Sequence, residues 1–237
     1  MKSISNTLST LAVAVLAGFA AVSCADTNNN GGGSVPLPDD MFYNFATYNG
    51  SAESSSSFTV QRDGDSGEAT VTFSQTFTKD QLKAGNRVFM AYTTVSGQQY
   101  VSGPGTLYSL SNATGDAPVA ATADNSVRLS TPVKMTEVKR TGDYLNMVFQ
   151  VPAQRSLKRM LLTVAENKKD PAYPVLGLYV RSDDETGDYR YARVSFDIKD
   201  VLAPADVKGI KVAYFDEKGV DTLTFVANTG SVITPTE

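Results

Sequence analysis

Alternation of apolar and polar residues at every second position is the feature that most constrains the fold of this chain. In the segment YLNMVFQV, Leu145, Met147 and Phe149 occupy alternate positions, and the same pattern recurs in residues 68–77, 190–198 and 209–216. A period of two predicts β-strands with one face on a core. The segment RVFMAYTTV, residues 87–95, is apolar on both faces, which predicts a central or barrel strand.

Helical signals are scarce in this sequence. Only TKDQLKAGN has them, because Thr78 and Gln81 have the spacing of a capping box and Gly85 supplies a stop. We therefore expect one short helix near residues 78–84. Short strands at regular spacing, with turn residues between them, predict an all-β protein built as a barrel or a sandwich.

A stretch of low apolar content divides the chain. Residues 111–126, SNATGDAPVAATADNS, contain no aromatic side chain. We interpret them as an interdomain linker, although a long surface loop would have the same composition. The linker separates a unit at 41–110 from a unit at 127–228, followed by a tail at 229–237. We expect limited proteolysis to cut the linker, or the polar stretch before the first unit, before other sites.

The N-terminus has the features of a secretory signal. Lys2 precedes an apolar run at residues 11–22, and a membrane-spanning helix needs about 20 apolar residues. We therefore assign residues 1–23 to a signal peptide. The run ends in AVSC, which resembles the lipobox of bacterial lipoproteins, where the signal is cut before the cysteine and the thiol is lipidated. Cys24 is thus the predicted lipidation site, and the membrane is the predicted partner of that lipid. The alternative is an ordinary cleaved signal followed by a free cysteine.

Two further consequences follow from this terminus. Cys24 is the only cysteine in the chain, so no intramolecular disulfide can form. Residues 24–40 are rich in Asn, Gly, Ser and Pro, which predicts a flexible tether with a mean reach of about 20–25 Å. We expect the folded part to stand off the membrane by that distance.

The composition excludes several kinds of chemistry. The chain has no histidine, so Ser-His-Asp triads, Cys-His pairs and His-ligated metals are excluded. No nucleophile elbow, P-loop or dinucleotide fingerprint is present. The net charge of −4 argues against a nucleic-acid partner. We therefore expect no enzymatic activity, no cofactor and no metal. A carboxylate pair of the glycosidase kind stays possible, because such pairing is spatial.

Two acidic segments are candidate calcium sites. DGDSGEAT begins like a calcium loop at Asp63 and Asp65, but its later positions do not match, so a hairpin turn is the better interpretation. RSDDETGDYR, residues 181–190, contains four acids between two expected strands. A solvated hairpin tip, with charge offset by Arg181 and Arg190, is favoured over weak calcium binding.

Three stretches carry a family resemblance. They are QLKAGNRVFMAYTTVSGQQYVSG, TGDYLNMVFQV and YARVSFDIKDVL. With the lipobox and its tether, their order resembles the NigD-like family of Gram-negative cell-envelope lipoproteins. The resemblance implies an N-terminal OB-like barrel, a C-terminal β-sandwich, and a lipid anchor in the outer membrane on its periplasmic or surface face. It transfers no site to this chain beyond Cys24.

These observations favour a non-enzymatic binding module whose ligand is a protein, a peptide or a glycan. Barrels of the OB kind bind extended ligands across an exposed face, so Tyr92, Tyr100 and Tyr108 are candidate ligand contacts if they are exposed rather than in the core. One alternative is a bacteriocin-associated immunity or export factor, which rests on the family name. The other is a glycan-active enzyme that uses paired carboxylates.

Overall fold

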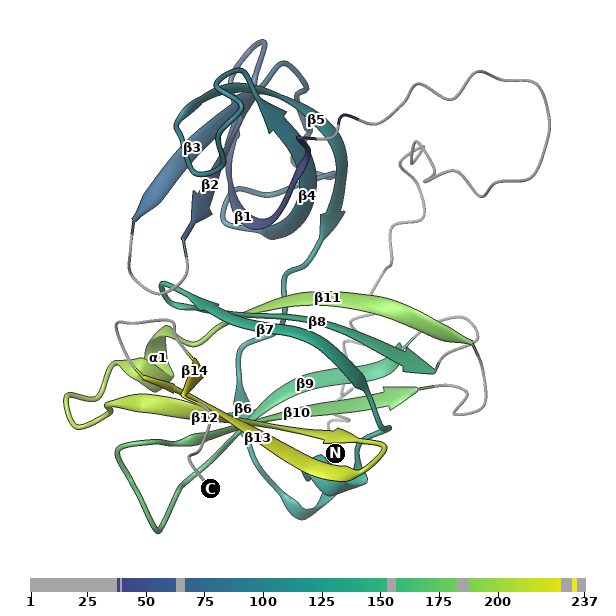
Figure 1. Cartoon of the computed structure of the whole chain (residues 1–237), viewed down its shortest axis with the longest axis vertical. Helices are drawn as coiled ribbons and strands as arrows, with labels where there is room; N and C mark the ends of the chain where they lie inside the picture. The colour runs from purple at the N-terminus through teal and green to yellow at the C-terminus, as the bar shows by residue number, and fades with distance from the viewer. Residues whose placement is uncertain are drawn as a thin grey trace, which may run out of the picture.

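The chain folds into a closed β-barrel followed by a β-sandwich (Figure 1), which confirms the all-β prediction. The computed structural model describes residues 38, 40–62, 67–152, 157–182, 188–226 and 232–233. The barrel strands are β1 (Phe42–Ser51), β2 (Ser56–Gln61), β3 (Glu68–Phe73), β4 (Arg87–Thr94) and β5 (Gly103–Asn112). They pair in the order β1-β2-β3-β5-β4, and β4 closes the barrel on β1.

The barrel has the topology of an OB fold. Strands β3 and β5 pair in parallel, and the other neighbouring strands are antiparallel. Inward-facing positions follow the predicted alternation, with Ala69, Val71 and Phe73 of β3 all buried. Aromatic rings fill the interior, including those of Tyr48 and Phe58, whose centroids lie 5.1 Å apart.

The predicted helix at residues 78–84 is wrong. The amides of Gln81 and Leu82 both donate to the carbonyl of Thr78, so the segment forms a single turn. The local signals are present, because the Thr78 amide donates to Gln81 Oε1 at 2.9 Å and Gly85 has a φ of +89°. The turn stops there because the Gly85 amide donates to the carbonyl of Tyr48, which returns the chain to the barrel.

Two sheets form the sandwich. One sheet has the order β14-β13-β12-β10-β9-β6, and the other has the order β11-β8-β7. Their strands are β6 (Val119–Ala120), β7 (Lys134–Thr141), β8 (Tyr144–Pro152), β9 (Leu157–Ala165), β10 (Val175–Ser182), β11 (Tyr189–Asp197), β12 (Gly209–Asp216), β13 (Gly219–Val226) and β14 (Val232–Ile233). The α-helix α1 (Lys199–Leu202) joins β11 to β12. Among the described residues, no helix has the length and apolar character needed to cross a membrane.

The core of the sandwich lies between the two sheets. Leu145, Met147 and Phe149 of β8 are each 0% exposed and face this core, as their alternation predicted. From the larger sheet, Leu176 of β10 and Val212 of β12 pack in the same core.

Residues 111–126 are hydrogen-bonded to both units. The Ala113 amide donates to the carbonyl of Arg87 in the barrel, and the Ala113 carbonyl accepts from the Ser195 amide in the sandwich. The Gly115 amide donates to the Ser195 carbonyl at 2.9 Å. Strand β6 then pairs in parallel with β9, and the 3-10 turns η1 (Ala123–Asn125) and η2 (Val127–Leu129) lead to β7.

The acidic segments fall largely outside the described residues. The hairpin expected around Asp63 and Asp65 is confirmed by the antiparallel pairing of β2 with β3, but residues 63–66 themselves are not described. Residues 183–187 are not described either. The strands on either side of them, β10 and β11, lie in different sheets, so this segment connects the sheets and is not the hairpin tip that we expected.

Candidate binding cleft between the barrel and the sandwich

Arg87 joins the barrel to the outer face of the three-stranded sheet, on which the barrel sits (Figure 1). Its side chain is 2% exposed. Nε donates to Ser195 Oγ at 2.9 Å, and Nη2 donates to Asn146 Oδ1 at 3.1 Å, both across the boundary between the units. Nη1 donates to Thr47 Oγ1 within the barrel, and the guanidinium lies 4.1 Å from the centroid of the Tyr144 ring.

The partners of Arg87 are neutral. Ser, Thr and Asn side chains accept its hydrogen bonds, and no carboxylate of the described residues makes an ion pair with it. Burial lowers the pKa of Arg87 to about 10, and the proximity of Tyr144 and Asp197 opposes that shift. The group is still a cation at neutral pH. Its hydrogen bonds fix the barrel against the sheet and so define the cleft beside them.

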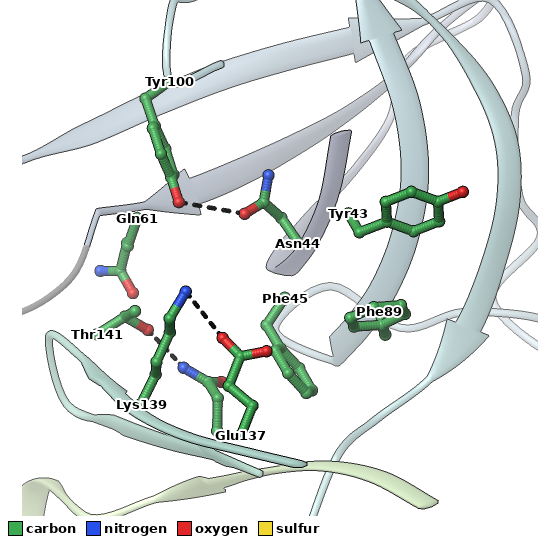
Figure 2. Close-up of a pocket in the computed structure, with 10 residues that line it drawn as sticks. Tyr43, Asn44, Phe45, Gln61, Phe89, Tyr100, Glu137, Lys139 and Thr141 are labelled. Atoms are coloured by element: carbon green, nitrogen blue, oxygen red, sulfur yellow. Dashed lines mark hydrogen bonds and ion pairs between the residues drawn. The ribbon is translucent and has the colours of Figure 1, made fainter. Parts of the chain in front are cut away.

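The cleft is built by both units (Figure 2). It has about 40 Å³ of room for water-sized groups, which is space for roughly three water molecules. Only a small part of a ligand can therefore enter, and the rest would lie on the rim. The barrel contributes Tyr43, Asn44, Phe45, Gln61, Phe89 and Tyr100, and the sandwich contributes Glu137, Lys139, Thr141 and Asn146.

One side of the cleft is aromatic. Phe45 of β1 and Phe89 of β4 are register partners, and their rings meet edge to face with centroids 5.1 Å apart. Tyr43 is 56% exposed beside them, and Figure 2 shows its ring next to that of Phe89. The exposed ring of Tyr43 offers a flat apolar surface on which a ligand can pack.

The other side of the cleft is polar. Glu137 and Lys139 lie at alternate positions of β7 and form an ion pair of 2.8 Å. The Gln61 amide nitrogen donates to Glu68 Oε1 at 2.7 Å, whereas Gln61 Oε1 is buried and accepts no hydrogen bond from the residues that the structure describes. This oxygen is available to a donor from a ligand or from water.

The three tyrosines singled out in the sequence have different surroundings. Tyr92 is 0% exposed in the barrel core, so it is not an exposed aromatic, because alternation along β4 turns its ring inward. Tyr100 lines the cleft, and its hydroxyl donates to Asn44 Oδ1 at 3.3 Å. Tyr108 of β5 is half-buried and does not line the cleft.

Asn44 connects the core to the cleft. Its amide nitrogen donates to the Tyr92 hydroxyl at 3.0 Å, and its Oδ1 accepts from Gln99 as well as from Tyr100. Tyr100 has a φ of +60°, in the left-handed region that non-glycine residues rarely adopt. A conformation of this kind costs about 1–3 kcal/mol and tends to occur at functional sites.

The remaining candidate chemistry is limited. Cys24 lies outside the described residues. Among the described residues, no group of three or more potential metal ligands comes together, and no Asp or Glu is buried. A wider depression of about 580 Å³ lies on the sandwich beside α1, and its lining consists mainly of proline, valine and acidic residues. It is formed mostly by loops and receives no residue from the barrel strands.

Apart from Tyr100, the cleft residues had no individual signal in the sequence. Tyr43, Gln61, Glu137 and Lys139 meet only because the barrel packs on the sheet. The alternate spacing of Glu137 and Lys139 was visible, and it would have placed them on one face of a strand. It would not have shown that this face meets β1.

Comparison with known proteins identifies the fold. No protein-family model and no curated protein matches the sequence. A protein of unknown function from Bacteroides vulgatus has a similar structure, with a TM-score of 0.61 and 20% identity over 82% of this chain and 96% of that chain. A NigD-like immunity protein from Bacteroides caccae follows, with a TM-score of 0.55 and 18% identity over 85% and 100%. A candidate lipoprotein from Bacteroides fragilis has a TM-score of 0.52 and 10% identity over 80% and 98%.

These similarities extend over both units of the chain. Since each solved structure is matched over nearly its whole length, the pairing of a barrel with a sandwich is common to all three. The resemblance to NigD-like proteins is thereby confirmed at the level of the fold, and the chain has the two-unit, all-β architecture of a NigD-like protein.

Proposed function

We propose that this protein is a lipid-anchored lipoprotein of the cell envelope that binds a polar ligand, without catalysis, in the cleft between its barrel and its sandwich. The observation that carries the proposal is the composite cleft, with its aromatic wall, its free amide oxygen and its strained tyrosine. The ligand is a protein surface, a peptide or a glycan. Its donors would meet Gln61 and Glu137, and a flat apolar part would pack on Tyr43.

The proposed location rests on the N-terminus. The short apolar run ends in Val-Ser-Cys24, and a polar stretch separates Cys24 from β1. A candidate lipoprotein has the same fold. We place the anchor in the outer membrane, on its periplasmic or surface face.

The absence of catalysis is also part of the proposal. Lys139 is paired with Glu137, and among the described residues no carboxylate is buried as the acid of a glycosidase would be. The glycan-active alternative therefore has no support from the described residues.

A second candidate function is immunity to a bacteriocin. The observation that favours it is the likeness to a protein described as a NigD-like immunity protein. Such a role would be a special case of binding, with a toxin as the ligand. Expression in a sensitive strain should then protect it, and protection should be lost with Tyr43→Ala.

The anchor is tested by Cys24→Ala. We expect wild-type protein in the membrane fraction and the variant in the soluble envelope fraction, because the variant lacks the lipidated thiol. An exported variant that stays bound to membranes after a high-salt wash would contradict lipid anchoring.

Ligand binding is tested with a soluble form beginning near Ser34 on glycan and peptide arrays. Tyr43→Ala should abolish the signal, because the exposed ring forms part of the cleft wall. Leu129→Ala is a matched control, since Leu129 is 61% exposed, close to the 56% of Tyr43, and does not line the cleft. Equal loss in both variants, or no loss in either, would contradict binding at the cleft.

A further inference from the structure

Among the residues that the structure describes, strand β11 has an unpaired edge over much of its length. On one side it pairs with β8 from Tyr189 to Asp197 without a register shift. On the other side, the only described partner is the segment around Thr114, which meets β11 at Ser195. Tyr191, 56% exposed, and Tyr189, 39% exposed, lie on the open part. An exposed edge of this kind is a template for another strand.

The hydrogen bonds of Ser195 show which backbone groups face this edge. Its amide donates to Ala113 and its carbonyl accepts from Gly115, so both groups point away from β8. In an antiparallel pair, residues alternate between those bonded to the partner strand and those directed outward. The N–H and C=O groups of Arg193, Tyr191 and Tyr189 therefore also point to the free edge.

The side chains along this edge are cationic and aromatic. The Arg193 guanidinium lies between two rings, 4.8 Å from the centroid of Phe89 and 5.4 Å from that of Tyr191. Arg190 is exposed on the same strand. Neither arginine makes an ion pair with another described residue. This edge therefore carries positive charge, although the net charge of the protein is −4. The two rings hold Arg193 in place and leave the donors at its rim to solvent.

We propose that an extended acidic peptide segment of a partner protein binds by adding a strand to the free edge of β11. The outward groups of Tyr191 and Arg193 would pair with the peptide backbone, and a carboxylate of the peptide would bind Arg193. Asp188 is exposed just before the strand and would repel a carboxylate of the peptide. We therefore place the acidic residue of the peptide near Arg193, away from Asp188. The segment around Thr114 already occupies the next position of this edge, and the peptide would continue that pairing.

The positive charge of this edge favours an acidic peptide over a second copy of this chain as the binding partner. Two copies joined through β11 would bring Arg190 and Arg193 of each chain into one short ladder without an intervening ion pair. Like charges across a ladder are destabilising. An acidic strand removes this repulsion and supplies the missing partners.

Amide hydrogen exchange of the soluble form, followed by NMR, tests the geometry. The probes are ten-residue peptides in which β-branched residues alternate with glutamate, with matched peptides that carry lysine instead. In the free protein we expect fast exchange at Tyr191 and Arg193 and slow exchange at Ala192 and Val194, whose amides face β8. The acidic peptides should slow exchange at Tyr191 and Arg193 at least about tenfold at saturation, and the lysine peptides should not.

Arg193→Gln should weaken the binding of the acidic peptides about tenfold or more, because a charge-assisted hydrogen bond is lost. Arg159→Gln, an exposed arginine on β9, is the matched control and should leave binding unchanged. Equal binding of both peptide sets, no binding at about 1 mM peptide, or protection of these amides by self-association without peptide would overturn the proposal.

Discussion

Tyr92 is the residue through which the barrel core reaches the cleft. Its ring packs against Phe73 at 5.9 Å between centroids, and its hydroxyl accepts from Asn44, which in turn accepts from Tyr100. The side-chain amide of Asn44 thus connects the buried hydroxyl of Tyr92 to Tyr100, the loop residue with a positive φ. Removing the hydroxyl would leave the Asn44 donor without its buried partner.

Alkaline titration tests this arrangement. Burial raises the pKa of Tyr92 to about 12, above the ordinary value of 10.0. Since the folded value is the higher one, the stabilisation is fully present below about pH 10 and is lost as the pH rises through about 12. We expect the free energy of unfolding, measured in urea, to fall less between these two pH values in Tyr92→Phe than in the wild type.

Tyr214 is the internal comparison for that experiment. Its pKa is also raised, by burial and by its hydrogen bond to Asp221, and Tyr92→Phe leaves it in place. An identical pH dependence in the wild type and the variant would show that Tyr92 ionises like an exposed tyrosine.

At the scale of elements, the contact of the segment 113–115 with β11 depends on a glycine. A Cβ added at Gly115 would lie 2.5 Å from Cδ1 of Phe196 and 2.9 Å from Cγ2 of Val194. The backbone of Gly115 is not in the left-handed region, so the constraint is close approach and not conformation. An alanine there must lift the segment from the strand.

Gly115→Ala should therefore destabilise the protein by about 1–3 kcal/mol. It should also speed amide exchange at Ser195, whose N–H donates to Ala113. The control is Asp116→Ala, at the exposed neighbouring position. Unchanged exchange at Ser195 in the glycine variant would mean that the segment is not held by this contact.

Strands were predictable from local pattern, and the cleft was not. Alternation identified β3, β8, β11 and β12, because each has one face on a core. The same local reasoning failed at Thr78–Gln81, where the capping residues are present but the bond from Gly85 to Tyr48 ends the turn. Tyr100 was found as a candidate because it is aromatic, whereas its place in one cleft with Lys139 depends on how two separate units pack.

At the scale of the whole molecule, Arg87 was the least predictable residue. It opens a strand whose next five residues are apolar, and an arginine there is expected at the surface, because burial of an unpaired cation is costly. In the structure it bonds to Ser195 and Asn146 of the other unit. With the bonds of residues 113–115, it connects the barrel to the sandwich, which favours coupled unfolding of the two units. Early cleavage at 111–126 stays a prediction for limited proteolysis.

We therefore expect the wild type to unfold in one transition and Arg87→Met to separate it into two. The substitution keeps an apolar stem but removes the two charge-assisted hydrogen bonds that cross to the sandwich, which should weaken the contact between the units by about 2–4 kcal/mol. Relief of the buried charge offsets part of that loss, since burial is the main cause of the lowered pKa of Arg87.

Hydrogen exchange measured by mass spectrometry across a urea series reports both units at once, through peptides from β2–β3 and from β9–β10. The control is Arg159→Met, which alters an exposed arginine outside the interface. Different midpoints for the two sets of peptides in the wild type, or a single midpoint for both in Arg87→Met, would show that Arg87 does not couple the barrel to the sandwich.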